Sequence, residues 1–260
     1  MNLFVCVKQV PATNAVQVDP QTGVLLRGGV ESKMNPYDLF ALEAALRLRE
    51  ARGGRITVGT MGPPQAEAVL REAVMMGADR AFLFTDRRFA GADVLATSYT
   101  LAQAIRSIGD FDAILCGKQT TDGDTAQVGP AIAEHMGIPH AAWVSAVEAD
   151  GEGLTVEQQL GERVERCYLP FPCLITVEQD IYTPRLPSLR RAKEIGGDWP
   201  VERRDLSGFL DQDAEHYGLC GSPTRVERIF APEHDTKREL LRGGGLGRAL
   251  YERLKARKLI

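Results

Sequence analysis

The amino-acid sequence predicts an α/β protein whose core is a doubly wound parallel sheet. In the first half of the chain, short apolar runs alternate with segments whose apolar residues recur every three to four positions. Strands that alternate with helices favour parallel βαβ units, with helices covering both faces of the sheet. The second half has a different pattern, which predicts antiparallel strands added to one side of the sheet and then an extended C-terminal arm.

Four short apolar runs predict the strands of the parallel sheet: residues 3–10, 55–61, 80–85 and 113–116. Nearly continuous apolar runs are typical of strands that are buried on both faces. Helical patterns lie between these runs, at residues 38–51, 65–76 and 94–108. Gly53 and Gly77 follow the first two patterns, so we expect them to end these helices as C-cap glycines do.

The connection from the first strand to the first helix is about 25 residues long, whereas such loops usually have two to six. Two short alternating segments, residues 16–18 and 24–26, flank a turn-rich stretch within it. This pattern predicts a β-hairpin. Inserted after the first strand, the hairpin would border a ligand crevice at the carboxyl end of the sheet.

After about residue 140 the alternation of strand and helix stops. Segments at residues 141–147, 154–160, 163–168 and 173–178 predict the added antiparallel strands. Periodicity is lost from about residue 182, and a helical pattern resumes only at residues 246–257. We therefore expect an α/β domain over residues 1–182 and an arm over residues 183–260 that wraps a partner.

Composition excludes several classes of protein. The chain has 260 residues, 25% charged residues and a formal net charge of −4, which exclude collagen-like and disordered chains and disfavour nucleic acid as a partner. No apolar run reaches the roughly 18 residues of a membrane helix, so membrane insertion is not expected. The five cysteines are odd in number and form no CxxC motif, which favours reduced thiols in a cytoplasmic protein.

The most informative segment is the run CGKQTTDGDTAQVGP at residues 116–130, between the fourth strand and a helix predicted at residues 126–135. Backbone N–H groups and the helix dipole at such a place favour a phosphate group. The run matches neither the Walker A nor the GxGxxG pattern. Two interpretations stay open: a nucleotide-binding loop, or a segment in which Asp122, Asp124 and Thr125 only cap the helix.

Two further segments end at the same edge of the predicted sheet. Residues 35–38, Asn-Pro-Tyr-Asp, could hold an adenine or ribose, but taken alone they favour an N-cap with a proline in the first helical turn. Residues 61–64, Met-Gly-Pro-Pro, are equally consistent with room for a ligand and with a tight turn.

Motifs for catalysis by side chains are absent from the sequence. The four histidines are at positions 135, 140, 216 and 234, without HExxH or GxSxG, and we expect neither a metal site nor catalytic residues. Cys167 and Cys173 lie in strand-like sequence and are expected to be structural. A basic cluster (Arg185, Arg190, Arg191 and Lys193) surrounds Leu186 and is either a solvated stretch or a docking loop.

Taken together, these segments resemble the β subunit of electron transfer flavoproteins over nearly the whole chain. The resemblance rests on VCVKQVP at residues 5–11, MNPYD at 34–38, MGP at 61–63, MGAD at 76–79, the loop at 117–130, CLITV at 173–177 and LPS at 186–188. It implies a fold similar to adenine-nucleotide α-hydrolases. It also implies a partner, the α subunit, which holds the electron-carrying FAD and is wrapped by the C-terminal arm.

The resemblance also carries residue roles. The positions that fall where the family binds its β-subunit nucleotide are Cys6, Val7, Lys8, Asn35, Pro36, Tyr37, Asp38, Met61, Gly62, Gly117, Lys118, Gln119, Thr120, Thr121, Asp122, Gly123, Asp124, Thr125, Ala126, Gln127 and Val128. Leu186 falls where the family has an exposed leucine that recognises acyl-CoA dehydrogenases.

The loop resembles one branch of the family more than the other. Ordinary members bind AMP as a structural ligand, whereas residues 122–130, DGDTAQVGP, are similar to the electron-bifurcating branch, whose β subunit binds a second FAD. Thr120 and Thr121 depart from that branch, which often has Ala-Ile. The branch implies NADH as the electron donor. The acceptors are the α-subunit FAD, which serves an acyl-CoA or hydroxyacid dehydrogenase, and ferredoxin or flavodoxin.

Two alternatives remain at this stage. One is a non-bifurcating β subunit that holds AMP and turns nothing over. The other is a universal-stress-like ATP-binding protein that acts alone, which would need neither the arm nor the Leu186 loop.

Overall fold

The computed structural model describes residues 1–12, 31–197, 199–227 and 239–260. The chain divides into two units: an α/β unit, Met1–Gln17 and Arg27–Glu227, and a C-terminal unit, Val18–Leu26 and Arg228–Ile260. In the described part of the C-terminal unit there is one helix, α6 (Leu246–Ala256), close to the predicted bounds. The predicted hairpin at residues 16–26 lies outside the described residues.

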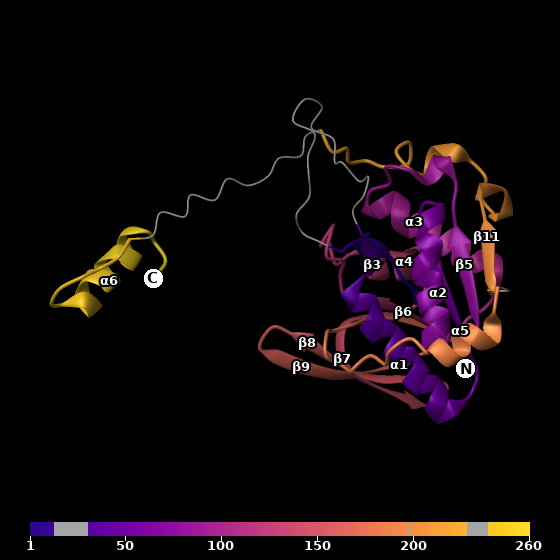
Figure 1. Ribbon diagram of the computed structural model, residues 1–260, viewed down its shortest axis with the longest axis horizontal. Helices are drawn as coiled ribbons and strands as arrows, with labels where there is room; N and C mark the ends of the chain where they lie inside the picture. The colour runs from indigo at the N-terminus through magenta and orange to yellow at the C-terminus, as the bar shows by residue number, and fades with distance from the viewer. Residues whose placement is uncertain (13–30, 198, 228–238) are drawn as a thin grey trace. The chain divides into compact units, whose positions relative to one another are not determined.

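The α/β unit is built on a nine-stranded sheet with the order β11-β5-β4-β1-β6-β10-β7-β8-β9 (Figure 1). β1 (Asn2–Cys6) lies between β4 (Arg55–Met61) and β6 (Ala113–Gly117), parallel to both. The remaining strands are β5 (Arg80–Phe84), β7 (His140–Asp150), β8 (Gly153–Leu160), β9 (Arg163–Pro170), β10 (Cys173–Val177) and β11 (Val201–Arg204). The predicted fold class, a mixed α/β protein with a large, mostly parallel sheet flanked by helices, is confirmed.

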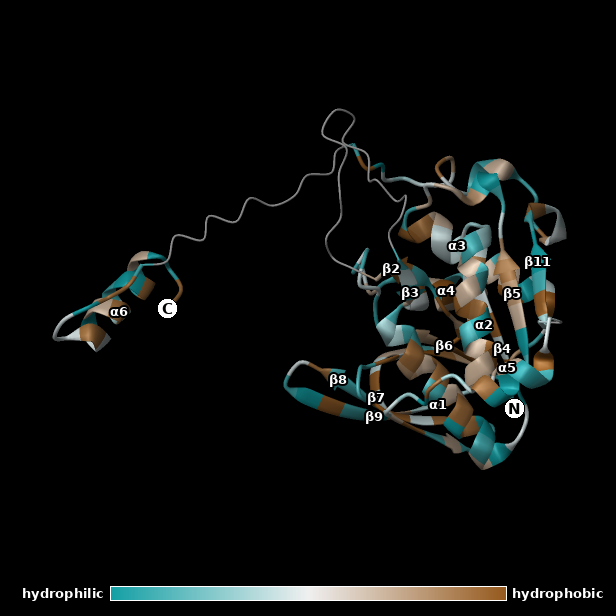
Figure 2. Ribbon diagram, in the orientation of Figure 1, coloured by the Kyte–Doolittle hydropathy of each residue, from teal (hydrophilic) through white to brown (hydrophobic). Residues whose placement is uncertain are grey.

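Helices cover both faces of the sheet, as a doubly wound fold requires. Side chains of β1 alternate between two cores: Leu3 and Val5 pack with α1 (Pro36–Arg52) and α2 (Glu67–Met76), whereas Phe4 packs with α3 (Val94–Ile108) and α4 (Val128–Met136). Apolar residues are concentrated along the inner strands (Figure 2). The buried sheet therefore holds the carboxyl ends of its central strands at one edge.

Local signals explain the bounds of several helices. The side chain of Asp93 accepts a hydrogen bond from the backbone N–H of Ala96 and caps α3, which matches its predicted range. Gly53 and Gly77 lie at the C-caps of α1 and α2, as predicted. The helix predicted from residue 65 begins instead with a 3₁₀ turn, η1 (Pro64–Ala66). The other short helical elements are η2 (Arg87–Phe89), α5 (Leu189–Ile195), η3 (Leu206–Gly208) and η4 (Ala214–His216).

The first predicted strand, residues 3–10, is two strands in the structure. β1 ends at Cys6, and β2 (Gln9–Pro11) pairs antiparallel with β3 (Ser32–Met34) in a separate sheet. Lys8 causes the break: its N–H donates to the Asp38 carboxylate and its carbonyl accepts from the N–H of Asn35. The backbone of Lys8 therefore bonds the start of α1 in place of a neighbouring strand.

The prediction that residues 173–178 form an antiparallel addition is wrong. β10 lies between β6 and β7 and is parallel to both, and within the nine-stranded sheet antiparallel pairing is confined to β7 with β8 and β8 with β9. All five residues of β10 are buried. A strand covered on both faces is an interior strand, whatever the direction of the strands that precede it.

An extended conformation is expected from residue 183 onward, but the first part of this segment packs against the α/β unit. β11 pairs parallel with β5 at the edge of the main sheet, and the buried side chains of Leu206, Phe209 and Tyr217 pack against Phe89 and its neighbours. These apolar residues are irregularly spaced and show no period. The wrapping of a partner by the remaining arm stays a prediction.

In the described ranges, no helix has both the length and the apolar character that crossing a membrane requires.

Candidate functional site

The candidate site lies where the strand order reverses direction. From β1 the chain proceeds to β4 and β5 on one side, then crosses to β6 on the other side of β1. Crevices at such switch points, beyond the carboxyl ends of the strands, bind ligands in open α/β sheets. The segments that follow β1 and β6 and the one that opens α1 meet here, and they contain most of the residues predicted to contact a nucleotide.

Asp38, in the first turn of α1, is the buried carboxyl group of this crevice. Its Oδ2 accepts a hydrogen bond of 2.7 Å from the backbone N–H of Lys8. Burial raises the pKa of Asp38 to about 7, and this effect outweighs the hydrogen bonds from Asn35 and Lys8, which act in the opposite direction. The carboxyl group therefore joins β1 to α1 and changes charge near neutral pH.

Asn35 precedes α1 at its N-cap position, but its side chain does not cap the helix. The fully buried amide Nδ2 donates to the carbonyl of Gln119 at 2.8 Å, and Oδ1 accepts from the backbone N–H of Thr121 at 3.3 Å. The capping interpretation, favoured for this segment alone, is therefore wrong for the side chain. Asn35 instead holds the loop after β6 against the start of α1.

Gly117, the last residue of β6, marks a close approach of two segments. A Cβ atom at this position would collide with the carboxylate of Asp38 and with the backbone of Tyr37. Only a residue without a side chain fits. The loop after β6 is thus packed directly against the first turn of α1, where Tyr37 Oη also lies 3.4 Å from Gln119 Nε2.

The loop itself has an unusual backbone. Asp124 and Ala126 have φ angles of 51° and 56°, in the left-handed region that non-glycine residues rarely occupy. The carbonyl of Thr120 accepts the N–H of Asp124 at 3.0 Å, which closes a turn around Gly123. Residues 121–125 are exposed. Strained backbone of this kind clusters at ligand-binding sites.

The helix after the loop begins at Val128, two residues later than predicted. Gln127 is the N-cap residue, and its side chain makes no capping hydrogen bond. In the described part of the chain, no hydrogen bond joins Asp122, Asp124 or Thr125 to α4, so the capping interpretation of this loop has no support. In the first turn of α4, Val128 and Gly129 carry N–H groups whereas Pro130 has none, and these two groups with the positive dipole end suit an anionic group.

Two lysines border the loop, and each is paired with a carboxylate. Lys8 Nζ lies 2.8 Å from Asp122 Oδ1, and Lys118 Nζ lies 2.7 Å from Glu178 Oε1. Burial raises the pKa of Asp122, but the hydrogen bond and charge of Lys8 dominate together and hold it below its ordinary value. Both lysines are therefore already paired with carboxylates, and Asp124 adds a further negative charge to the loop.

Sequence reasoning missed three residues at the edge of this site. Trp143 has a φ angle of 59°, and its N–H donates to Thr176 Oγ1 at 3.0 Å. The Lys118 ammonium group, which is paired with Glu178, lies 5.0 Å from the centre of the Trp143 indole ring. These residues belong to β7, β10 and the segment after β10, and no local motif marks them in one sequence.

Other residues predicted to contact a nucleotide lie nearby but make fewer hydrogen bonds within the site. Cys6 is half-buried at the end of β1, and Val7 is buried with its N–H bonded to the carbonyl of Gly59. Met61 ends β4, next to β1, and Gly62 follows the strand, with its N–H bonded to the carbonyl of Phe84. Among the described residues, no hydrogen bond joins Met61 or Gly62 to the loop after β6.

Leu186 lies in a different region, before α5, and is 87% exposed. Arg185 anchors this segment: its guanidinium bonds Glu43 Oε2 at 2.8 Å and Glu50 Oε1 at 2.7 Å, and its N–H also donates to Glu43. The anchor holds the backbone to α1 and leaves the Leu186 side chain in solvent. The basic cluster is thus divided, because Arg185 is paired with the buried Glu43, whereas Arg190 is 88% exposed and pairs with the exposed Glu194.

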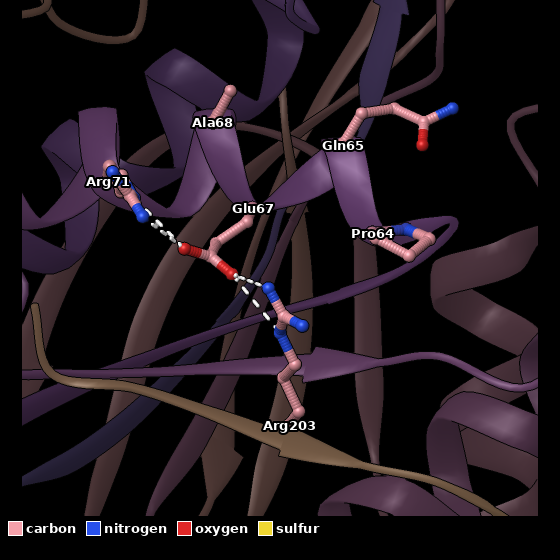
Figure 3. A pocket seen from close by; sticks show the side chains of 6 residues that line it. All are labelled: Pro64, Gln65, Glu67, Ala68, Arg71 and Arg203. Carbon is pink, nitrogen blue, oxygen red and sulfur yellow. Dashed lines mark hydrogen bonds and ion pairs between the residues drawn. The ribbon is translucent and has the colours of Figure 1, made fainter.

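Two hollows in the surface lie away from the crevice. The first, about 280 Å³, lies at the start of α2, where Glu67 bonds both Arg71 and Arg203 (Figure 3). The second, about 500 Å³, is lined by Tyr99, His135 and His216 among others. In Figure 3 the arginines point to Glu67, so their charge is compensated within the protein. Pro64, from the candidate segment at residues 61–64, lines the first hollow, and the second contains no residue predicted to bind a nucleotide.

Metal-binding and thiol chemistry are not prominent. Among the described residues, no group of three or more His, Cys, Asp or Glu side chains could hold a metal ion. Cys173 is fully buried, and burial raises the pKa of its thiol to about 12. Cys167 is half-buried in β9, 3.5 Å from Gln158 Oε1.

Comparisons with known proteins agree on one family. Residues 22–205 match the model of the electron transfer flavoprotein domain. An electron transfer flavoprotein subunit beta from Thermoanaerobacterium thermosaccharolyticum is 44% identical over 262 residues, which cover all of both chains. Protein FixA from Azorhizobium caulinodans is 45% identical over 89% of this chain and 85% of its own. The caffeyl-CoA reductase-Etf complex subunit CarD from Acetobacterium woodii is 38% identical over the whole of both chains.

Proposed function

Because this chain belongs to the electron transfer flavoprotein family, with β-subunit relatives along its whole length, we propose that it is the β subunit of an electron-bifurcating member. In this proposal it pairs with an α subunit and holds FAD beyond the carboxyl ends of β1 and β6. It oxidises NADH only as part of that complex, in the cytoplasm.

The geometry that carries this proposal is the uncapped first turn of α4 beside the left-handed loop. FAD contains a diphosphate, and the N–H groups at the start of α4 suit it. Gly117 keeps the loop close to α1, and the half-buried Thr120 with the exposed Thr125 and Gln127 offers neutral hydrogen bonds. Asp38 and Asn35, on the other wall, would face the adenosine half.

A bound FAD supplies two-electron oxidation of NADH and one-electron delivery to separate acceptors. The chain's residues bind the cofactor and set the polarity around it. The Lys8–Asp122 pair compensates the charge of Asp122, and Trp143 with Lys118 offers a planar, polarised surface at the edge of the loop. One acceptor is the α-subunit FAD, which serves an acyl-CoA or hydroxyacid dehydrogenase, and the other is ferredoxin or flavodoxin.

The exposed Leu186 supports a second part of the proposal. A leucine that is 87% exposed beside an anchored arginine suits insertion into an apolar pocket of a protein partner. We assign this segment to recognition of the dehydrogenase. The basic residues that follow it would steer an acidic surface toward it.

The alternative is a non-bifurcating β subunit that holds AMP as a structural ligand. AMP has one phosphate group and would use the same first turn of α4. The similarity to CarD, a subunit of a caffeyl-CoA reductase-Etf complex, and the loop sequence DGDTAQVGP at residues 122–130 favour FAD.

The deciding experiment counts nucleotides. The chain is co-expressed with its α-type subunit, the purified complex is denatured, and the released FAD and AMP are quantified by chromatography. Two FAD and no AMP per heterodimer are expected, followed by reduction of the bound flavin on addition of NADH. One FAD and one AMP would overturn the bifurcating assignment and leave a structural nucleotide site.

A further inference from the structure

Two cysteines face each other directly beneath the candidate site. β1 and β6 are paired in parallel, with Val5 opposite Leu115. Continued by one residue, this register places Cys6 opposite Cys116. Both side chains belong to the same side of the sheet, because Cys116 is part of the core formed with α3 and α4 and Cys6 packs against that core.

The two thiols are in contact and differ in accessibility. The hydrogen bond with Cys6, followed by burial, raises the pKa of the Cys116 thiol well above its ordinary value. Cys6 is half-buried at the strand end and Cys116 is only 6% exposed, so a reagent from solvent reaches Cys6 first.

The spacing suits a covalent link. Neighbouring strands lie about 4.7–4.9 Å apart, which is within the Cα separations of about 4.4–6.8 Å found for disulfides. The half-buried Cys6 keeps such a link open to thiols from solvent, and accessible disulfides are the readily reduced ones. The first turn of α4 lies over this position, since a Cβ at Gly129 would be 3.5 Å from the Cβ of Cys116.

We propose that Cys6 and Cys116 form a reversible dithiol–disulfide site that ties β1 to β6 below the loop at residues 117–127. The oxidant is a low-molecular-weight disulfide. Its sulfur forms a mixed disulfide with Cys6 and releases one thiol. Cys116, which lies opposite Cys6, then loses its proton to the leaving sulfur and displaces the second thiol. Two S–H bonds are lost and one S–S bond forms, while two electrons and two protons pass to the oxidant, which leaves as two thiols.

The test uses the full chain with the substitution Cys220→Ser, because Cys220 is exposed and would form links between molecules. The folded protein is incubated with oxidised glutathione, remaining thiols are alkylated after denaturation, and peptides are identified by mass spectrometry. We expect a loss of about 2 Da and a linked pair of peptides carrying Cys6 and Cys116, reversed by dithiothreitol.

Matched variants separate this pair from general thiol oxidation. Adding Cys173→Ala removes a buried thiol on the other side of the sheet and should leave the link intact, whereas Cys6→Ser should abolish it and leave Cys116 free. The same oxidation in urea should give far less of this link, because the unfolded chain keeps the two residues apart.

Two results would overturn the proposal. One is that Cys6 and Cys116 both remain free under conditions that fully oxidise Cys220 in the unsubstituted chain. The other is that Cys6 retains glutathione as a stable adduct while Cys116 stays unreacted. Neither result depends on which nucleotide the crevice binds, so failure here is distinct from failure of the proposed function.

Discussion

Two carboxyl groups of α1, Asp38 and Glu43, are buried to a similar extent, but their pKa values are shifted in opposite directions. Asp38 is 5% exposed and Glu43 2%. Burial raises the pKa of Asp38 to about 7. Burial also raises the pKa of Glu43, but the hydrogen bonds and charge of Arg185, with help from Arg47, outweigh it and hold this pKa below its ordinary value.

The difference follows from their partners. Asp38 is held mainly by backbone and amide donors in the crevice, which do not compensate a full negative charge. Glu43 bonds two guanidinium groups and stays ionised. The first turn of α1, with Asp38, is thus held by close packing against the candidate site. The next turn, with Glu43, holds the Leu186 segment through its ion pair with Arg185.

The largest expected effect is the pH dependence that Asp38 causes. Its pKa is about 7 in the folded state against 3.8 without the fold, so between these values the folded state retains a proton that the unfolded state releases. Raising the pH from 4 to 7 should therefore lower the free energy of unfolding, by up to about 4 kcal/mol. Asp38→Asn should remove this slope.

Urea unfolding of both proteins over this pH range measures the difference between them. If the free energy of unfolding depends on pH in the same way for the wild type and Asp38→Asn, then Asp38 has an ordinary pKa. Its carboxyl group would then be more exposed to water than the structure indicates.

Gly117→Ala tests the packing of the loop after β6 against the first turn of α1. The new Cβ would collide with Asp38 and Tyr37, so we expect a loss of about 3 kcal/mol of unfolding free energy, as for an overpacked core. Gly123→Ala is the matched control in the same loop. Its Cβ would meet only Thr120 Oγ1 at 3.5 Å, and a change under about 0.5 kcal/mol is expected. Equal effects would contradict the close approach at Gly117.

Arg185→Ala tests the charged anchor. It leaves Glu43 buried with Arg47 as its remaining partner, and we expect a loss of about 2 kcal/mol near neutral pH. Because the folded pKa of Glu43 is lowered, this contribution is present above about pH 4.5 and disappears as the pH falls further, opposite in sign to Asp38.

Arg190→Ala is the control for the anchor, since Arg190 and Glu194 form an exposed pair on α5. Urea unfolding at pH 7 and in acid should show little change for this variant. A loss as large as that for Arg185→Ala would mean that charge in this segment acts without the contact to Glu43.

The smallest effect on stability is expected for Leu186→Ala, within about 0.5 kcal/mol, because the side chain is exposed. Under the proposed function, electron transfer from the assembled flavoprotein to its dehydrogenase should fall by about tenfold, as for an interface hot spot. Stopped-flow kinetics with unchanged nucleotide content would measure this. An unchanged rate would remove Leu186 from the recognition surface.

Some elements follow from local sequence alone. The bounds of α3 and β4 agree with those predicted from residues 94–108 and 55–61, because periodicity, caps and apolar runs act over a few neighbouring residues. The loop after β6 is predicted as a ligand-binding segment for the same reason, since glycines and small polar residues between a strand and a helix are a local signal.

Other features needed the assembled fold. The direction of β10 and the place of β11 depend on strands far away in the chain. The bridging role of Asn35, the left-handed Trp143 and the raised pKa of Asp38 likewise arise from contacts between distant segments.

The sequence by itself determined the α/β class, most helix bounds, the loop expected to bind phosphate and the resemblance to one protein family. Tertiary structure decided strand order and direction, and which side chains close the crevice. The physical reason is that backbone propensity and capping are short-range, whereas strand pairing and desolvation depend on which segments the fold brings together.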